Sequence, residues 1–112
     1  MQVVFYMNAK GEEPAIDFLE SLDPKMKAKM TRIIHLLQVN GNKLREPYTK
    51  YLRDGIFELR AKEGSDISRV LYFYVTGNKA VLTHGFVKKT NRTPPSEIER
   101  AIKYRDDYSI QD

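Results

Sequence analysis

Three β-rich runs follow one another in the second half of the chain, and they constrain its fold more than any other feature. Residues 56–60, 68–75 and 79–87 are rich in Val, Ile, Leu, Phe and Tyr. Only short segments with turn-forming residues, at positions 63–66 and 76–78, separate them. Runs joined by such short turns are typical of consecutive antiparallel strands. The sequence therefore predicts an antiparallel meander.

Two helical patterns precede the meander. Pro14 suits a first helical position, and the apolar residues within 15–22 fall on one broad face. A second helix is predicted to begin at Asp23-Pro24, an N-cap followed by a first-turn proline, and to end at Asn40-Gly41. Its apolar residues recur at helical spacing: Met26, Met30, Ile33, Ile34 and Leu37. We expect a helical hairpin whose apolar stripes pack on the sheet.

The remaining segments complete the predicted order. Residues 2–7 form a first strand, and the polar, basic residues 42–53, which include Pro47, form a loop. Pro94-Pro95 opens a last helix with Ile98, Ala101 and Ile102 on its apolar side. The expected fold is a single α+β domain over residues 1–112, of order β-α-α-β-β-β-α. In it, the helical hairpin packs on a mostly antiparallel four-stranded sheet.

Composition excludes several classes of protein. The chain of 112 residues is 41% hydrophobic, enough for one packed core, and it has no cysteine for disulfides or thiolate metal sites. No apolar run approaches the ~18 residues that span a bilayer, and the first residues lack a signal-peptide pattern. We therefore expect a cytoplasmic protein that does not enter a membrane. His35 and His84 have no carboxylate at ligand spacing, so no metal and no cofactor is expected.

Positive charge is concentrated in the second part of the chain. The net charge is +4, but residues 1–42 carry five basic and five acidic groups, which cancel. Residues 43–105 carry 14 Lys and Arg against seven Asp and Glu. This basic part is expected to meet phosphates, although a basic balance is also common in small proteins with no nucleic-acid partner.

Four segments in this basic part carry a family resemblance. They are Leu52–Arg60, Ser68–Phe73, His84–Thr90, and Thr93-Pro94 ahead of a helix that contains Ala101. Their pattern and order resemble the RelE superfamily of toxins, most closely its phage-derived HigB-like branch. The resemblance extends over nearly the whole chain.

The resemblance implies a fold, an activity and a partner. It implies a toxin of a type II toxin–antitoxin system, a small ribonuclease that enters the ribosomal decoding site and cuts messenger RNA there. A helix–turn–helix, HigA-like antitoxin would neutralise it, in a toxin–antitoxin hetero-oligomer. The active-site arginines and lysines of the family fall on Arg60, Arg69, Lys88 and Lys89. The family's C-terminal base-stacking tyrosine has no clear match, since Tyr104 and Tyr108 are only loosely placed.

The residues themselves suit this chemistry. Metal-independent cleavage requires a deprotonated 2′-hydroxyl, neutralised charge on the phosphate and a protonated leaving oxygen. Arg60 and Arg69 suit phosphate clamping, because the guanidinium grips two oxygens, whereas Lys88 and Lys89 can move protons if neighbouring cations lower a lysine pKa. The alternative is that each is an ordinary surface charge at a strand end.

Two residues are considered as acid–base groups. Glu58 alternates onto the face of Arg60 and either accepts a proton or forms an ion pair that holds the arginine. By strict alternation His84 shares a face with Leu82 and Phe86, which favours packing over catalysis. If Phe86 instead points to the concave face, His84 joins the site.

Basic residues interleaved with tyrosines are predicted to contact RNA, because aromatic rings stack on unpaired bases. The alternatives are a solvated loop and ordinary sheet packing of the tyrosines. Two other functions remain open: a binding module that holds nucleic acid or protein without cutting, and a phage structural protein. The predicted RNA-contacting residues are Lys43, Arg45, Lys50, Tyr51, Arg53 and Arg92.

Overall fold

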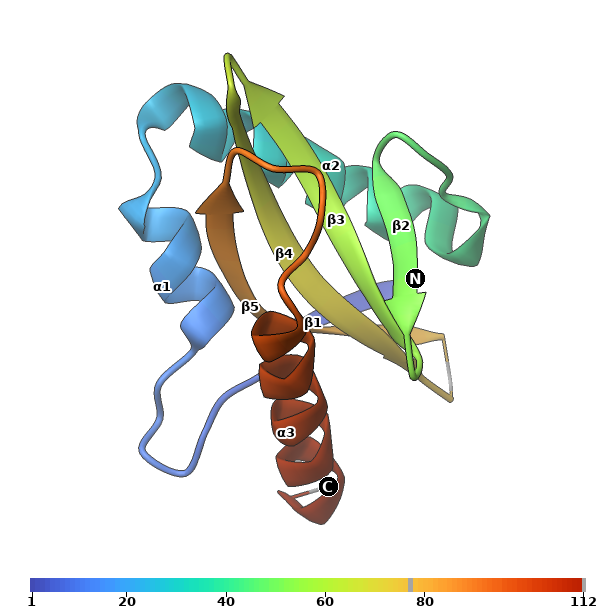
Figure 1. The fold of residues 1–112 in the computed structure, drawn as a ribbon. Helices are drawn as coiled ribbons and strands as arrows, with labels where there is room; N and C mark the ends of the chain where they lie inside the picture. Colours follow the sequence, from blue (N-terminus) through green and yellow to red (C-terminus); the bar gives the residue numbers. More distant parts are fainter. Residues whose placement is uncertain (77, 112) are drawn as a thin grey trace.

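A five-stranded mixed sheet forms the centre of the protein in the computed structural model, which describes residues 1–76 and 78–111 (Figure 1). The strand order is β1-β5-β4-β3-β2; β1 is parallel to β5, and all other neighbours are antiparallel. The strands are β1 (Gln2–Phe5), β2 (Thr49–Arg53), β3 (Ile56–Glu63), β4 (Asp66–Val75) and β5 (Lys79–Lys88).

The helices begin where the sequence predicts. They are α1 (Pro14–Ser21), α2 (Pro24–Asn40) and α3 (Pro95–Gln111), with a short 3-10 helix, η1 (Gly41–Lys43), after α2. The side chain of Asp23 caps α2 by accepting a hydrogen bond from the Met26 N–H at 3.0 Å. Gly41 ends α2 with a φ of 56°, which glycine adopts without strain. Within the described residues, no helix is both long and apolar enough to span a bilayer.

Helices cover both faces of the sheet. α1 and α2 pack on one face, with Met30, Leu37, Leu59 and Tyr72 in a shared core. α3 descends along the opposite face, where Ile98 and Ala101 contact a second core (Figure 1). We call these the hairpin face and the α3 face. The predicted α+β class and the packing of the helical hairpin are confirmed.

The predicted number of strands is wrong, because residues 49–53 form β2 rather than a loop. β2 pairs with β3 from Thr49 opposite Leu59 to Arg53 opposite Ile56. Asp54-Gly55 forms the two-residue turn between them, with φ values of 52° and 79°, as a tight hairpin turn requires. The polar composition of β2 follows from its place at the sheet edge, where Lys50 and Tyr51 are exposed.

A register shift between β4 and β5 changes which face His84 occupies. Leu71 lies opposite His84 but Tyr72 lies opposite Leu82, so Thr83 is an extra residue in β5. Leu82 therefore packs on the hairpin face, whereas Phe86 packs on the α3 face. The prediction that His84 shares a face with Leu82 is wrong, because it assumed unbroken alternation.

Candidate functional site

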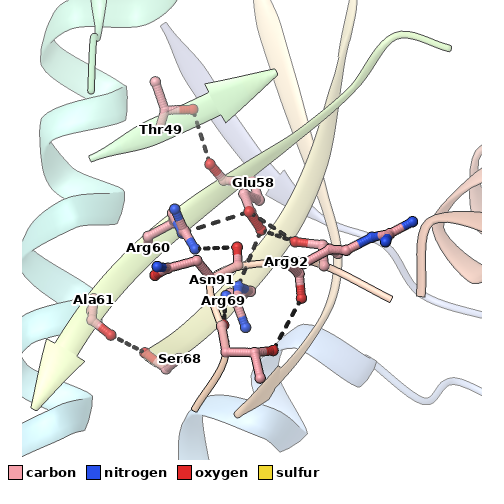
Figure 2. Close-up of polar contacts among 10 residues, drawn as sticks. Thr49, Glu58, Arg60, Ala61, Ser68, Arg69, Asn91 and Arg92 are labelled. Carbon is pink, nitrogen blue, oxygen red and sulfur yellow. Dashed lines mark hydrogen bonds and ion pairs between the residues drawn. The ribbon is translucent and has the colours of Figure 1, made fainter. Parts of the chain in front are cut away.

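Two arginines meet around one carboxylate on the α3 face of the sheet. Arg60 of β3 lies opposite Arg69 of β4, and Glu58 is two residues before Arg60, so all three side chains share a face. The Glu58 carboxylate lies 3.6 Å from Arg60 Nε and 3.3 Å from Arg69 Nε (Figure 2). Glu58 thus forms the expected ion pair with Arg60 and a second one with Arg69. We call these three residues the arginine cluster.

The segment that joins β5 to α3 crosses over this cluster. The Asn91 carbonyl accepts a hydrogen bond from Arg60 Nη2 at 2.7 Å, and the Thr90 carbonyl accepts one from Arg69 Nη2 (Figure 2). The Thr93 hydroxyl lies 2.5 and 2.9 Å from the two carboxylate oxygens of Glu58. Residues 90–93, which we call the strap, therefore bind all three members of the cluster.

The strap leaves the cluster almost closed to solvent. The side chains of Glu58 and Arg69 are 0% exposed, and that of Arg60 is 16% exposed. Burial lowers the pKa of Arg69, an effect that Glu58 opposes and the neighbouring Arg60 cation increases. Among the described residues, Arg69 Nη1 is buried without a hydrogen-bond partner. The cluster thus holds an excess of buried positive charge and an unused donor, a combination that suits an anion.

A threonine and a tyrosine fix the backbone beneath the cluster. The Thr49 hydroxyl of β2 donates to the Glu58 carbonyl at 3.1 Å and lies 2.6 Å from the Tyr72 hydroxyl. Because the single Thr49 proton is directed to that carbonyl, Tyr72 donates to Thr49. Burial raises the pKa of Tyr72, which keeps this hydroxyl protonated.

The two predicted catalytic lysines point in different directions. Lys88 lies opposite Ile67, which shares the face of Arg69, so exposed Lys88 belongs to the α3 face. Lys89 instead lies near the turn between β3 and β4, with its ammonium 3.6 Å from the Asp66 carboxylate and 3.5 Å from the Ser65 hydroxyl. The structure brings Arg60, Arg69 and Lys88 to one face and leaves Lys89 outside it.

His84 lies on the α3 face but has both ring nitrogens engaged. Its Nδ1 lies 3.1 Å from the Thr83 hydroxyl and its Nε2 lies 3.0 Å from Glu97 Oε1. The residue is 2% exposed, and burial lowers its pKa while Glu97 partly restores it. These contacts give His84 a packing and hydrogen-bonding role between β5 and α3.

Four of the predicted RNA-contacting residues line one groove of about 440 Å³ between β2, the strap and the start of α3. They are Lys50, Tyr51, Arg53 and Arg92, and we call this the basic groove. Asn91 and Thr93 of the strap line it as well, so the groove and the arginine cluster share one wall. Arg53 is also paired with Asp54 at 2.6 Å and with Glu99 at 3.2 Å.

Lys43 and Arg45 lie outside the basic groove. Lys43 ends η1, and Arg45 lines a neighbouring groove of about 250 Å³ together with Lys50 and Tyr51. The C-terminal tyrosines are partly buried against the core of the α3 face: Tyr104 stacks on Tyr6 at 4.7 Å between ring centroids, and Tyr108 meets Phe73 edge-on. Neither tyrosine lies in the basic groove.

The sequence predicted an RNA contact for Arg92 of the strap, but it did not predict that the strap binds the arginine cluster. Thr93 is one of the residues that carry the family resemblance, but no function was predicted for it. The contacts of Thr90 and Asn91 are made by backbone carbonyls, which every residue has, so the residue type does not indicate them. Thr93 is buried in the structure, but in the sequence a threonine next to Pro94 gives no signal of an internal hydrogen-bond partner. Nothing in the local sequence shows that this segment returns across β3.

Comparison with known proteins adds one finding. The family model described as "Phage derived protein Gp49-like (DUF891)" matches residues 17–106, a span that contains the arginine cluster, the strap and the basic groove. No curated protein matches the chain.

Proposed function

The chain belongs to the Gp49-like family of phage-derived proteins, which is associated with RelE and toxin-like modules, and from this premise we propose a specific activity. The protein is the toxin of a type II toxin–antitoxin pair and cleaves messenger RNA on the ribosome as a metal-independent endoribonuclease. The observation that carries the proposal is the meeting of Arg60 and Arg69 on one face of the sheet, beside the basic groove.

The strap suggests how RNA reaches the arginines. The carbonyl oxygens of Thr90 and Asn91 occupy guanidinium donors that would otherwise bind phosphate oxygens. Lys50, Arg53 and Arg92 neutralise the RNA backbone in the basic groove. The Tyr51 ring contacts Phe57 on the hairpin face, so the predicted base stacking does not occur in this groove. RNA bound there lies against the strap, and its phosphate replaces the strap carbonyl at Arg60, the member of the cluster that is partly exposed.

Each part of the site has one role in the reaction. The ribose 2′-hydroxyl gives its proton to a water molecule, its oxygen attacks the phosphorus, and the bond to the 5′-oxygen breaks. This leaves a 2′,3′-cyclic phosphate and a 5′-hydroxyl. Arg60 stabilises the charge on the pentavalent phosphate, and Lys88 donates a proton to the leaving oxygen. Glu58, held by two arginines and Thr93, fixes Arg60, and Arg69 adds positive charge from below.

Controlled expression in bacteria tests this activity. Wild-type protein should stop growth and cut messages within reading frames only where ribosomes are present. Arg60→Gln, which leaves the Glu58–Arg69 pair intact, should abolish both effects, whereas Lys27→Gln on the exposed surface of α2 should retain them. Cleavage of naked RNA at the same sites would contradict the dependence on ribosomes.

A non-catalytic binding module is the second candidate, and the closure of the cluster favours it. Glu58 and Arg69 are fully buried, so a protein whose strap never moves would hold RNA in the basic groove without cutting it. Such a protein would be harmless on expression and would still bind single-stranded RNA in a filter-binding assay. Growth arrest that depends on Arg60 would eliminate this candidate.

The proposed partner is a HigA-like helix–turn–helix antitoxin in a hetero-oligomer with the toxin. The neighbouring reading frame should encode it, because the two genes of such modules are adjacent. Co-expression from both frames should restore growth and yield a complex that co-purifies. A partner frame whose product neither binds nor restores growth would contradict this part of the proposal.

A further inference from the structure

A separate groove lies between α2 and β3, beneath the segment that leads into β2. Its volume is about 390 Å³, within the range of roughly 300–1,000 Å³ typical of ligand sites. Apolar side chains form its floor: Ile33, Leu36, Pro47 and Ala61. We call it the α2–β3 groove; none of the predicted RNA-contacting residues lines it.

The rim of the α2–β3 groove is positively charged. Lys29, Arg32 and Lys62 line it, against the single carboxylate of Glu46. Arg60 lines it too, but its guanidinium is bound in the arginine cluster on the α3 face. Lys29 is paired with Glu63 at 2.5 Å, and Arg60 with Glu58. Arg32 and Lys62 are exposed and form no ion pair within residues 1–76 and 78–111. Charge complementarity therefore favours an occupant that carries carboxylates.

The groove also contains a free stretch of strand edge. β2 pairs with β3 only as far as Thr49 opposite Leu59, and the Tyr48 carbonyl then accepts a hydrogen bond from the Arg60 N–H at 3.0 Å. Backbone groups two residues apart on a strand face the same way, so the Lys62 N–H also faces the groove. Lys29 Nζ already binds the Lys62 carbonyl at 2.9 Å. An extended chain can accept a hydrogen bond from this N–H and continue the line of β2.

From these three features we propose that the α2–β3 groove binds an extended peptide segment of a partner protein, in which apolar residues alternate with Asp or Glu. The apolar residues would pack on Ile33 and Ala61, and the carboxylates would pair with Arg32 and Lys62. The floor is aliphatic, only Tyr48 among the lining residues is aromatic, and Glu46 stands at the rim. These features oppose RNA, which needs stacking surfaces and binds away from carboxylates.

The groove is connected to the arginine cluster through β2. Tyr48 and Thr49 line the groove, and they also hold the Arg60 N–H and the Glu58 carbonyl. A peptide in the groove therefore acts on the backbone that positions the cluster, without covering the basic groove. The assignment of the peptide to the antitoxin rests on the proposed function. The inference that the groove binds a peptide does not depend on it.

Titration with a defined probe tests the groove itself. The probe is a blocked hexapeptide of alternating glutamate and valine, and a second hexapeptide has lysine in place of glutamate. In NMR titrations the glutamate peptide should shift resonances of Ile33, Leu36 and Ala61, and the lysine peptide should not. The double variant Arg32→Glu with Lys62→Glu should weaken binding at least tenfold. Lys10→Glu with Lys27→Glu, which changes the net charge equally on exposed residues outside the groove, should not.

Three results would overturn the inference. They are peptide-induced shifts outside the groove, equal weakening by the two double variants, and a short single-stranded RNA that shifts the same groove resonances.

Growth assays test the identity of the partner. The variant with Arg32→Glu and Lys62→Glu should still stop growth but should no longer be neutralised by the antitoxin, and full neutralisation would contradict the assignment. If the wild type does not stop growth, the proposed function fails while the titration still decides the groove.

Discussion

Glu58 is the residue on which the geometry of the site depends most. It is fully buried, and its carboxylate faces two guanidiniums and the Thr93 hydroxyl. Without its negative charge, Arg60 and Arg69 would face each other across neighbouring strands with no counter-ion between them. A buried charge that loses its partner is costly, so the carboxylate stabilises the fold as well as the site.

Glu58→Gln should therefore destabilise the protein by about 3–5 kcal/mol, because it removes the counter-charge with little change of shape. Urea unfolding followed by circular dichroism measures this difference. Glu63→Gln is the matched control, since Glu63 is an ion-paired carboxylate on the same strand but near the surface, and it should cost much less. Equal losses for the two variants would show that the cluster is not a special charge centre.

His84 gives the stability of the protein a dependence on pH. Burial lowers its pKa in the folded protein below the usual 6.5, so the unfolded chain binds more protons at mildly acidic pH. The unfolding free energy should therefore fall as the pH falls below about 6.5, and His84→Gln should flatten this part of the curve. Chemical unfolding between pH 5 and 7.5 checks the slope, which would be unchanged in the variant if His84 were not responsible.

At the scale of elements, the sequence predicts the helices, the first strand and the three meander strands well, and it misses the edge strand β2. The N-cap at Asp23 and the helical spacing up to Leu37 are local signals, and they are confirmed. The sequence did not predict β2, because an edge strand with exposed Lys50 and Tyr51 has the composition of a loop. The sequence also did not predict the register shift at Thr83, because a single extra residue does not change the apolar composition of the strand.

The strap is the element whose removal from the cluster the proposed activity requires. Thr93→Val keeps the shape of the side chain and removes both contacts with Glu58, so it should cost about 1.5–3 kcal/mol. Amide hydrogen exchange should become faster at Thr90 and Asn91, because the strap loses one of its contacts with the cluster. Thr31→Val, on the exposed surface of α2, should leave both quantities nearly unchanged. Unaltered exchange in Thr93→Val would mean that the arginines alone hold the strap.

At the scale of the whole molecule, the two faces of the sheet have different tasks. The hairpin face is packed by α1 and α2, whereas the α3 face combines a core near Ile98 with the arginine cluster beyond the start of α3 (Figures 1 and 2). Sequence alone placed the cations on consecutive strands, and cross-strand pairing supports that inference for Arg60 and Arg69. It did not separate Lys88 from Lys89, because the predicted strand ended at residue 87, whereas β5 extends to Lys88 and strand alternation then directs the two side chains apart.

RNA binding should depend on salt through the basic groove. Each cation that neutralises a phosphate of single-stranded RNA contributes a slope of about 0.7 in log K against log salt concentration. The double variant Lys50→Gln with Arg92→Gln should therefore lower the slope by about 1.4, as measured by fluorescence anisotropy from 50 to 300 mM salt. Lys10→Gln with Lys27→Gln should leave it unchanged. Equal slopes for all three proteins would place the RNA elsewhere.

The most direct test of the arginine cluster as a ribonuclease site is to map message ends, with their chemistry, in cells that express the protein. Wild-type protein should produce new ends within translated reading frames that carry a 2′,3′-cyclic phosphate, and Arg60→Gln, folded to the same extent by circular dichroism, should produce none. The same ends at the same level in Arg60→Gln would contradict the account.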